Sequence, residues 1–364
     1  MTSVAFYFSN FASGGVQRQS MSLGKALLQY GYDVTFVVHK AVGPHLEHVP
    51  AGARIHELGS KSTGRSILPM AQYIRQHKPA VLVANMPHSN IVAVAAKILS
   101  GFQLKVMAVE HNHFSRQLTD HKKKLSFRIL PYIYPLALKF ADAVVAVSAG
   151  VADDLAKAIK IDRARITVIH NPAVPDDIQA LASEPLPVDV TGGRPYVLAI
   201  GRLVPQKDFS TLLRAISLTK DLNLLILGDG PLRQQLQSEA MSLGIADRVK
   251  LAGFVANPYP LIANAELLAL SSIYEGFGNV IAEALALGTP VVSTDCESGP
   301  AEILAGGRYG SLVPVADDKA LAKAILATLE AKVPQDLQRR GQDFTIDRIA
   351  PLYMATLERM AARR

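Results

Sequence analysis

Cysteine is nearly absent from this chain, since Cys296 is the only one among its 364 residues. A single thiol excludes a framework of disulfides within the chain, so we expect the protein to work in a reducing compartment. The sequence also lacks a basic N-terminal start followed by an apolar core, and we therefore expect no secretory signal peptide. It has no uninterrupted run of about 18 apolar residues, so we expect no membrane-spanning helix.

Acidic residues are missing between Asp120 and Asp142, a stretch that carries the cations Lys122, Lys123, Lys124, Arg128 and Lys139. Residues 1–177 hold 20 basic and 11 acidic residues, whereas residues 178–364 hold 18 and 20. The basic excess therefore belongs to the first half of the chain. A basic face of this kind predicts contact with a polyanion, such as nucleic acid, an anionic membrane or a phosphorylated acceptor.

Short apolar strands alternate with helical stretches along almost the whole chain, which predicts an α/β fold with parallel, doubly wound sheets. The expected strands of the first half are 4–9, 33–39, 80–84, 104–109, 143–147 and 166–169. Those of the second half are 196–200, 222–227, 249–252, 267–270, 290–294 and 310–313. The proline- and glycine-rich residues 171–194 interrupt this rhythm and predict a linker between two domains.

The stretch 271–283 is the richest in groups that could bind a ligand. A strand is expected to end near Leu270, followed by a turn with Gly276 and Gly278 and then a helix from about Gly278. The free amides at the start of such a helix favour an anion, and the glycines let the backbone approach it closely. Glu275 and Glu283 flank this turn at a distance that suits one extended ligand held at two places.

Two further loops follow expected strands. Arg202 and Lys207 lie in the loop 201–209, where two cations could hold a diphosphate. Gly14 and Gly15 lie in the loop after the first strand, within Ser13-Gly14-Gly15-Val16-Gln17-Arg18. The third glycine of the dinucleotide fingerprint is missing there, so an ordinary turn is as good an interpretation.

The remaining candidates are less specific. Glu110-His111-Asn112-His113 follows an expected strand and suits polar contacts to a substrate, but no third ligand with metal-site spacing accompanies it. Cys296 has no activating base nearby in the sequence, which favours a packed residue over a nucleophile. The helix-like run 120–140 mixes apolar residues with cations, although Pro131 and Pro135 should break its regularity. It predicts either a membrane-interfacial surface or a core helix with a basic wet side.

Taken together, these motifs resemble glycosyltransferase family 4, the large retaining family with the GT-B fold. The resemblance covers nearly the whole chain, and its most specific part is the pair Glu275 and Glu283 within Tyr274-Glu275-Gly276-Phe277-Gly278 and the residues that follow. The loop with Arg202 and Lys207, the Gly14–Gly15 loop and Glu110-His111 also match in the right order. The chain looks most similar to bacterial members that build glycolipids and surface or lipid-linked polysaccharides.

The resemblance implies two Rossmann-like domains with the active site in the cleft between them. Residues 1–178 would form the acceptor-side domain, 179–345 would bind the nucleotide sugar, and the helix from 346 would pack back on the first domain. Arg202 and Lys207 would bind the donor diphosphate, and Glu283 would bind the ribose. Glu275 with the amides of Gly276, Phe277, Gly278 and Asn279 would hold the donor sugar and phosphate. Gly14 and Gly15 would face the diphosphate, His111 would contact the sugar, and Phe254 and Val255 would neighbour the base.

These implications predict a retaining transferase that uses a nucleotide diphosphate sugar, with uridine favoured as the base, and that needs no metal or other cofactor. Its acceptor would be a glycan or a lipid-linked sugar. We expect the protein in the cytoplasm, with peripheral contact to an anionic membrane through residues 121–139 and without nucleic acid as a partner. A sugar-nucleotide epimerase or a phosphorylase on the same fold is the alternative enzyme. A non-catalytic protein that binds an anionic surface is the alternative of a different class.

Overall fold

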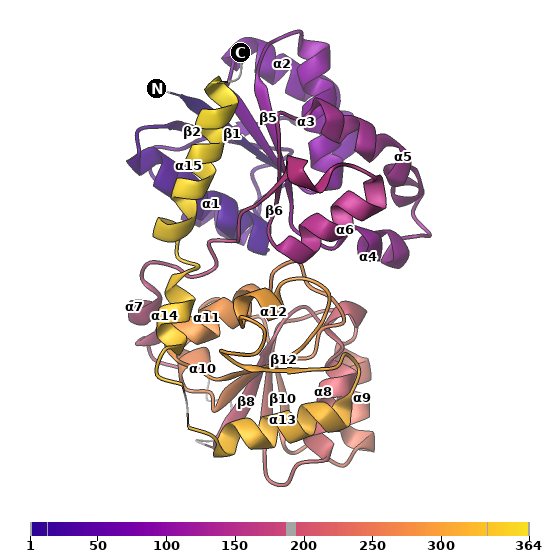
Figure 1. Ribbon diagram of the computed structural model, residues 1–364, viewed down its shortest axis with the longest axis vertical. Coiled ribbons are helices and arrows are strands. Elements are labelled where there is room, and N and C mark those ends of the chain that lie inside the picture. Colours follow the sequence, from indigo (N-terminus) through magenta and orange to yellow (C-terminus); the bar gives the residue numbers. More distant parts are fainter. Residues whose placement is uncertain (1, 13, 187–193, 333, 363–364) are drawn as a thin grey trace. The chain divides into compact units, whose positions relative to one another are not determined.

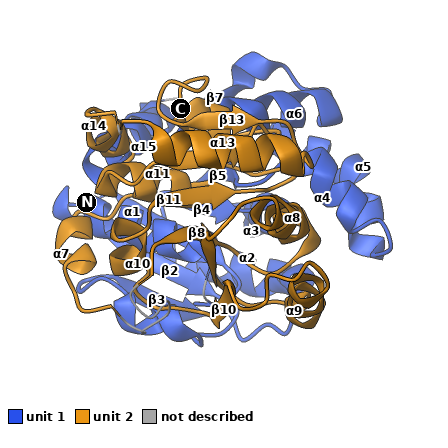
Figure 2. Ribbon diagram, turned by 90° about the horizontal axis from the view of Figure 1, so that it is seen from below, with its two compact units in different colours: residues 1–172, 346–364 blue, residues 173–345 orange. Residues whose placement is uncertain are grey.

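The computed structural model describes residues 2–12, 14–186, 194–332 and 334–362 (Figure 1). The chain forms two compact units, Met1–Pro172 with Ile346–Arg364, and Ala173–Thr345, which Figure 2 distinguishes by colour. The division thus falls at 172/173, six residues before the expected 178/179 boundary. Ser13 of the first glycine loop and part of the expected linker, residues 187–193, lie outside the described residues.

Unit 1 is built on a parallel seven-stranded sheet in the order β3-β2-β1-β4-β5-β6-β7. Its strands are β1 Ser3–Phe8, β2 Asp33–Val38, β3 Arg54–Glu57, β4 Val81–Asn85, β5 Lys105–Glu110, β6 Ala143–Ala146 and β7 Ile166–Val168. The central strands are buried along almost their full length, which is why they occur as continuous apolar runs. The six strands expected in this half are confirmed to within two residues at each end.

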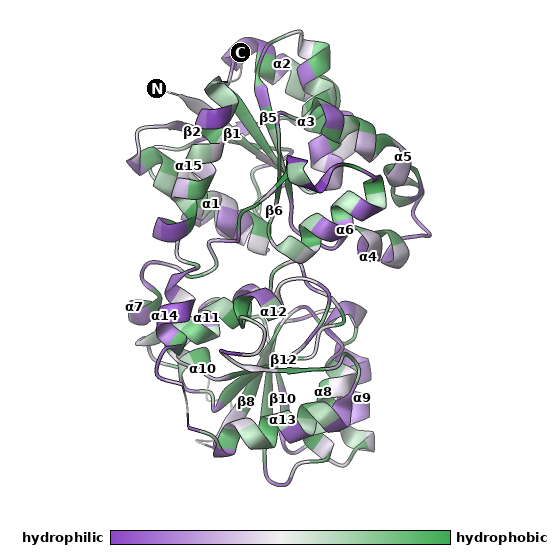
Figure 3. Ribbon diagram, viewed as in Figure 1, coloured by the Kyte–Doolittle hydropathy of each residue, from purple (hydrophilic) through white to green (hydrophobic). Residues whose placement is uncertain are grey.

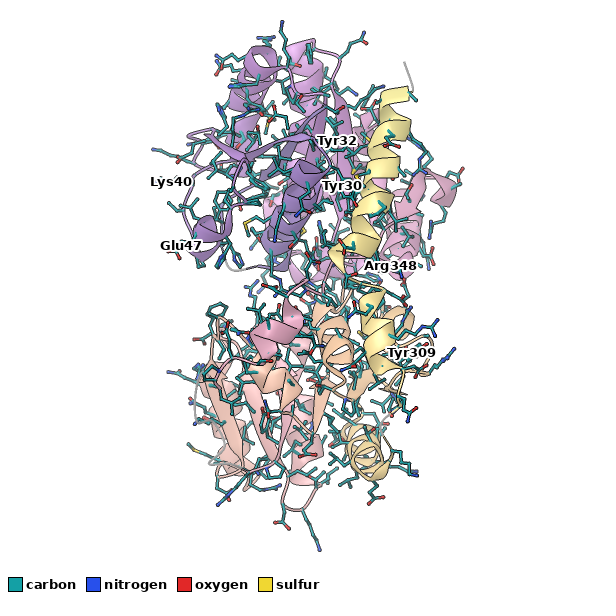
Figure 4. All side chains as sticks on the ribbon, turned by 90° about the vertical axis from the view of Figure 1, so that its left-hand side faces the viewer. Tyr30, Tyr32, Lys40, Glu47, Tyr309 and Arg348 are labelled. Atoms are coloured by element: carbon teal, nitrogen blue, oxygen red, sulfur yellow. The ribbon has the colours of Figure 1, made fainter. Side chains whose placement is uncertain are left out.

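Helices cover the sheet of unit 1. They are α1 Gly15–Gln29, α2 Ile67–His77, α3 Pro87–Ser100, α4 Phe114–Asp120, α5 Leu125–Phe140, α6 Ala149–Ile159 and α15 Ile346–Ala362, with 3-10 turns at η1 Pro44–His48, η2 Thr63–Ser66 and η3 Arg163–Arg165. The C-terminal helix α15 packs along α1. Figure 4 shows Tyr32, which follows α1, beside α15, where burial and the Glu358 carboxylate raise the pKa of its phenol.

Unit 2 repeats this plan with a parallel six-stranded sheet in the order β10-β9-β8-β11-β12-β13. Its strands are β8 Tyr196–Ile200, β9 Asn223–Leu227, β10 Val249–Gly253, β11 Leu267–Leu270, β12 Val291–Thr294 and β13 Ser311–Val313. Its helices are α7 Ile178–Ala182, α8 Phe209–Ser217, α9 Arg233–Ser242, α10 Tyr259–Ala263, α11 Asn279–Leu287, α12 Pro300–Ile303, α13 Asp318–Glu330 and α14 Leu337–Gln342, with η4 at Pro205–Lys207. All six strands expected in this half are confirmed, and the doubly wound α/β prediction holds for both units.

The expectation for residues 120–140 needs a correction. The run is not one helix, because α4 ends at Asp120 and α5 begins only at Leu125, which places Lys122, Lys123 and Lys124 in the turn between them. Pro131 and Pro135 do not end α5, which continues to Phe140. Each proline removes one backbone donor at a cost of roughly 3 kcal/mol. Burial of Leu130, Tyr134, Ala137 and Leu138 along one face offsets that cost.

Candidate functional site

The loops at the carboxyl ends of β8 and β11 form one polar cluster in unit 2. Lys207 Nζ lies 2.5 Å from Glu275 Oε1, and the Ser272 hydroxyl donates to the same oxygen over 2.6 Å. The Glu275 side chain is only 9% exposed and that of Lys207 18%, so this ion pair is largely shielded from water. The two charged residues that the sequence marked in separate loops are therefore brought together.

Hydrogen bonds to backbone carbonyl groups hold the two loops against each other. Ile273 N donates to Gln206 O over 2.8 Å, the Gln206 amide donates to Tyr274 O over 2.9 Å, and the Ser271 hydroxyl donates to Lys207 O over 2.8 Å. A third loop, after β12, joins them through Glu275 N and Glu297 O at 3.2 Å. Because these bonds hold both partners, the Lys207–Glu275 pair is a preorganised feature of unit 2.

The other expected residues of unit 2 surround this pair. Gly278 adopts a left-handed conformation (φ 97°) and precedes α11, which begins at Asn279, one residue later than expected. Glu283 lies on α11 and is 2% exposed. Arg202 is exposed, and its side chain has no ion-pair or hydrogen-bond partner among the described residues. Phe254 follows β10 and is 64% exposed, with the half-buried Val255 next to it. The exposed side chains of Arg202 and Phe254 thus follow strands of the same sheet as the buried Glu275 and Glu283.

Sequence reasoning missed the turn Gly228-Asp229-Gly230 after β9. A Cβ atom on Gly228 (φ 126°) would lie 2.1 Å from Gly201 O, and one on Gly230 would lie 2.5 Å from Leu203 O. Leu203 N donates to Asp229 O over 3.0 Å, so this turn supports the loop that carries Arg202. The paired glycines directly after an apolar strand were the signal that could have revealed it. Ser272 and Gln206 were also missed, because nothing in the sequence marks a serine or glutamine as the partner of a distant loop.

Cys296 is buried and does not have the properties of a nucleophile. Burial raises the pKa of its thiol to about 12, and the nearby Glu275 carboxylate acts in the same direction. The interpretation of Cys296 as a packed residue agrees with this environment. Among the described residues, no three His, Cys, Asp or Glu side chains gather as a metal site requires. The expectation that no metal is needed remains a prediction.

In unit 1 the carboxyl end of β5 carries a buried carboxyl group. Glu110 is 1% exposed, accepts a 2.8 Å hydrogen bond from the Asn90 amide and accepts another from the Tyr134 hydroxyl. Burial raises the pKa of Glu110 to about 8, although both of these hydrogen bonds act in the opposite direction. The group is therefore protonated at neutral pH. Asn90 comes from α3 and Tyr134 from α5, so this cluster ties two helices to the strand end.

The neighbouring His111 also lies inside unit 1. Its Nε2 atom is 2.8 Å from Asn85 Oδ1, at the end of β4, and burial lowers the pKa of its imidazole to about 4. His111 is therefore neutral over the physiological range. In the connection between β1 and α1, Gly14 caps α1 in an extended conformation and has no side chain to satisfy the first helical amides. The structure places Gly14, Gly15 and His111 in unit 1, and their predicted contacts with a donor remain predictions.

The raised pKa of Glu110 predicts a pH dependence of stability. The unfolded chain releases this proton near pH 4.5 and the folded chain near pH 8, so the free energy of unfolding falls as the pH rises between these values. Glu110→Gln removes this dependence. We expect its stability relative to the parent to increase with pH by up to roughly 1.4 kcal/mol per unit. Urea unfolding at pH 5, 6.5 and 8 measures it, and a difference that stays constant across this range would contradict the assignment.

Comparisons with known proteins agree with this arrangement. Residues 13–177 match the family model described as Glycosyltransferase Family 4, and residues 194–331 match the one described as Glycosyl transferases group 1. The chain is 29% identical over 324 residues to the lipopolysaccharide core biosynthesis glycosyltransferase LpsE of Rhizobium meliloti, covering 88% of this chain and 86% of LpsE. Over 242 residues it is 31% identical to an N-acetylgalactosaminyltransferase of Campylobacter jejuni that acts on a diphospho-undecaprenol-linked sugar, covering 66% of this chain and 64% of that one.

Solved structures share the fold. HepE of Anabaena, crystallised with UDP and glucose, superposes with a TM-score of 0.81 at 21% identity, and the match covers 98% of this chain and 100% of HepE. The apo form of the lipopolysaccharide outer core galactosyltransferase WaaB gives a TM-score of 0.76 at 19% identity, with 99% of each chain covered. At these identities the likeness establishes the fold, two Rossmann-like α/β domains.

Proposed function

The chain belongs to glycosyltransferase family 4, and from that premise we propose that it is a retaining enzyme that takes its sugar from a nucleoside diphosphate donor. The observation that carries this proposal is the Lys207–Glu275 pair, held by three loops at the carboxyl ends of parallel strands. Ligands of open α/β sheets bind outside these strand ends. Membership of the family indicates that the reaction is glycosyl transfer. The Lys207–Glu275 pair supports a nucleoside diphosphate sugar as the source of the transferred sugar.

Lys207 and Arg202 are the proposed diphosphate ligands. Arg202 is exposed and presents a planar fork of donors, whereas Lys207 supplies a point charge that is partly shielded from water. In a shielded site a cation stabilises developing negative charge more than it would in bulk water. We therefore assign to Lys207 the stabilisation of the departing nucleoside diphosphate, with the start of α11 as a second source of positive potential.

Other residues of unit 2 would contact the remaining parts of the nucleotide sugar, from the sugar to the base. Glu275 and the backbone of Gly276, Phe277, Gly278 and Asn279 would hold the sugar and the adjoining phosphate. Glu283 on α11 would bind the ribose hydroxyls. Phe254, with its exposed ring, and Val255 would contact the base. Uridine is the base that we favour, because HepE, which has the same fold, holds UDP.

Retention follows if the acceptor attacks the same face of the sugar that the phosphate leaves. The bond between the anomeric carbon and the phosphate oxygen breaks, the acceptor oxygen bonds to that carbon, and the acceptor proton passes to the departing phosphate. Glu275 is already engaged by Lys207 and Ser272, which suits a role in binding better than one as a covalent nucleophile. The donor diphosphate would then serve as the base, and no metal or other cofactor enters the scheme.

The acceptor that we propose is a glycan or a lipid-linked sugar of the bacterial surface. Support comes from the relatives, since LpsE belongs to lipopolysaccharide core synthesis and the Campylobacter enzyme acts on a sugar linked to undecaprenol diphosphate. In unit 1, Gly14 and Gly15 would face the donor diphosphate and His111 would contact the donor sugar, and these assignments rest on the family pattern alone.

Helix α5 supports contact with a membrane where such acceptors reside. No helix in the described part of the chain is both long and apolar enough to cross a bilayer. Six apolar side chains of α5 are nevertheless 42–82% exposed: Leu125, Ile129, Tyr132, Ile133, Leu136 and Phe140. Their spacing of three and four residues places them on one face of the helix, which we call the α5 face. Figure 3 shows this apolar helix at the edge of unit 1.

Exposed cationic side chains border the α5 face. Lys122, Lys123 and Lys124 lie exposed in the turn before it, and Arg128 and Lys139 are exposed on the helix itself. An apolar face bordered by lysines suits insertion at the interface of an anionic bilayer. Of the two interpretations that the sequence left open, this exposure favours the interfacial surface, and we propose residues 121–139 as the membrane contact.

A panel of nucleotides tests the donor assignment. We expect one of UDP, GDP and ADP to bind the purified protein selectively, without added metal, because Lys207 and Arg202 supply the positive charge. Isothermal calorimetry measures the affinities, and the sugar conjugates of the selected nucleotide then identify the sugar. Failure of every nucleotide to bind the folded protein would refute the proposed donor site.

A further inference from the structure

A small cavity lies within unit 1, between the sheet and the layer formed by α1 and α15. Phe6, Val83 and Val109 line it from three strands, and Tyr353 lines it from α15. Its polar lining includes Gln19, Asn85 and His111, together with Ser20, whose hydroxyl donates to Val16 O over 2.9 Å. Its volume of about 10 Å³ is at the lower limit of what a single water molecule requires.

Three polar atoms of this lining have no hydrogen-bond partner among the described residues. They are Gln19 Oε1, Asn85 Nδ2 and His111 Nδ1, and each is buried. Gln19 and Asn85 are 6% and 5% exposed, so bulk water does not satisfy them. Leaving a buried polar atom unpaired is unfavourable, and three such atoms around one cavity add to that cost.

The hydrogen-bond requirement of these atoms can be counted. His111 Nε2 lies 2.8 Å from Asn85 Oδ1, so in a neutral ring Nε2 carries the proton and Nδ1 accepts. The cavity then presents two acceptors, Gln19 Oε1 and His111 Nδ1, and one donor, Asn85 Nδ2. If the Asn85 amide is turned over, Asn85 Oδ1 becomes an acceptor and His111 Nδ1 becomes a donor. With the Gln19 amide as placed, these three atoms present two acceptors and one donor in both arrangements.

We infer that the cavity binds one water molecule, which donates to two of these atoms and accepts from the third. A water molecule can satisfy three such atoms, because it has two donor hydrogens and two acceptor lone pairs. The bound water links α1 to the ends of β4 and β5. Together with Asn85 it engages both ring nitrogens of His111 from within unit 1. His111 is then a positioning residue at the end of β5 and does not carry protons in the reaction.

The environment of His111 agrees with this assignment. Burial lowers the pKa of its imidazole to about 4, so the ring stays neutral where the enzyme works, and the hydrogen-bond count applies there. The water site does not depend on the proposed function, because no donor or acceptor group takes part in it. It restricts the sugar contact that the family pattern implies for His111, because a ring with both nitrogens engaged has no hydrogen bond left to offer a sugar.

Two measurements on the full-length protein test the water site. In a crystal structure that resolves ordered solvent, we expect one oxygen within hydrogen-bond distance of all three atoms, and its absence would overturn the assignment. In solution, nitrogen-15 spectra should show His111 as a single neutral tautomer from pH 5.5 to pH 9. Titration of its ring within that range would also overturn the assignment.

Gln19→Met provides the matched variant, because methionine fills a similar space and lacks the acceptor oxygen. Loss of one partner should release or loosen the water, and the His111 ring signals should shift and broaden. Gln29→Met, at the exposed end of the same helix, should leave them unchanged. Unchanged His111 signals in folded Gln19→Met would contradict the water site. If this variant does not fold, the crystal structure of the parent protein decides.

Discussion

Lys207→Ala should lower turnover at saturating donor by roughly 100-fold or more, the loss seen when one donor to a developing oxyanion is removed elsewhere. Its ammonium group is 2.5 Å from Glu275 in a shielded cluster, which is where a charge contributes most to stabilising the departing diphosphate. Steady-state release of the nucleoside diphosphate measures the effect. Lys220→Ala, which changes an exposed lysine of the same unit, is the matched control and should turn over normally.

The Lys207 variant also changes stability, and this effect must be separated from catalysis. Among the described residues, the buried Glu275 carboxylate without Lys207 keeps only the Ser272 hydroxyl as a side-chain hydrogen-bond partner, and breaking a buried pair costs on the order of 3 kcal/mol. Lys207→Ala combined with Glu275→Gln removes the unpaired charge. This double variant should regain stability and remain slow. Near-normal turnover by either variant would remove Lys207 from the proposed mechanism.

Reversal of the three lysines before α5 should abolish most binding to anionic vesicles. Each lysine near such a surface contributes about 1 kcal/mol, so loss of three charges weakens binding by about 100-fold, and their reversal weakens it further. Lys122, Lys123 and Lys124 are exposed in the turn that leads into the α5 face. Cosedimentation of the triple Lys→Glu variant with vesicles of phosphatidylglycerol and phosphatidylcholine measures the change.

The controls for this experiment separate charge from apolar insertion. Reversal of Lys319, Lys323 and Lys332, which are exposed in unit 2, changes the net charge equally and should leave vesicle binding intact. Replacement of Leu125, Ile129 and Tyr132 by serine should weaken binding while leaving the cations in place. Vesicles of phosphatidylcholine alone should bind the parent protein poorly. Unchanged binding of the Lys122, Lys123 and Lys124 variant would refute the α5 face as the membrane contact.

Buried strands were the most predictable part of the fold. Runs such as 4–9 and 267–270 are apolar on both faces because both faces are covered, and the sequence carries that pattern directly. The edge strand β3, Arg54–Glu57, was missed because its side chains are largely exposed and form no apolar run. Pro131 and Pro135 lie inside α5 although local propensity opposes a helix there, because packing of residues such as Tyr134 stabilises one.

The candidate site was predictable where a residue type reveals its own chemistry. Charged and glycine-rich loops after strands pointed to Lys207 and Glu275, but not to their direct contact or to Ser272. Partnerships between distant loops depend on the register of the sheet and on loop conformation, which no local pattern encodes. The same holds for Asn90, whose contacts with Glu110 and Tyr134 become apparent only when the helices are packed, and for Gln19, whose place in the cavity lining does so too.

Product stereochemistry tests the central claim, retaining transfer from a nucleotide sugar, most directly. The protein is incubated with the sugar conjugate of the nucleotide that it binds, with water as a slow acceptor, and the first sugar released is followed by proton NMR before its anomers equilibrate. We predict that the sugar appears with the same anomeric configuration as in the donor, together with one equivalent of nucleoside diphosphate. First release of the opposite anomer, or conversion of the donor into another sugar nucleotide without release of either product, would contradict the account.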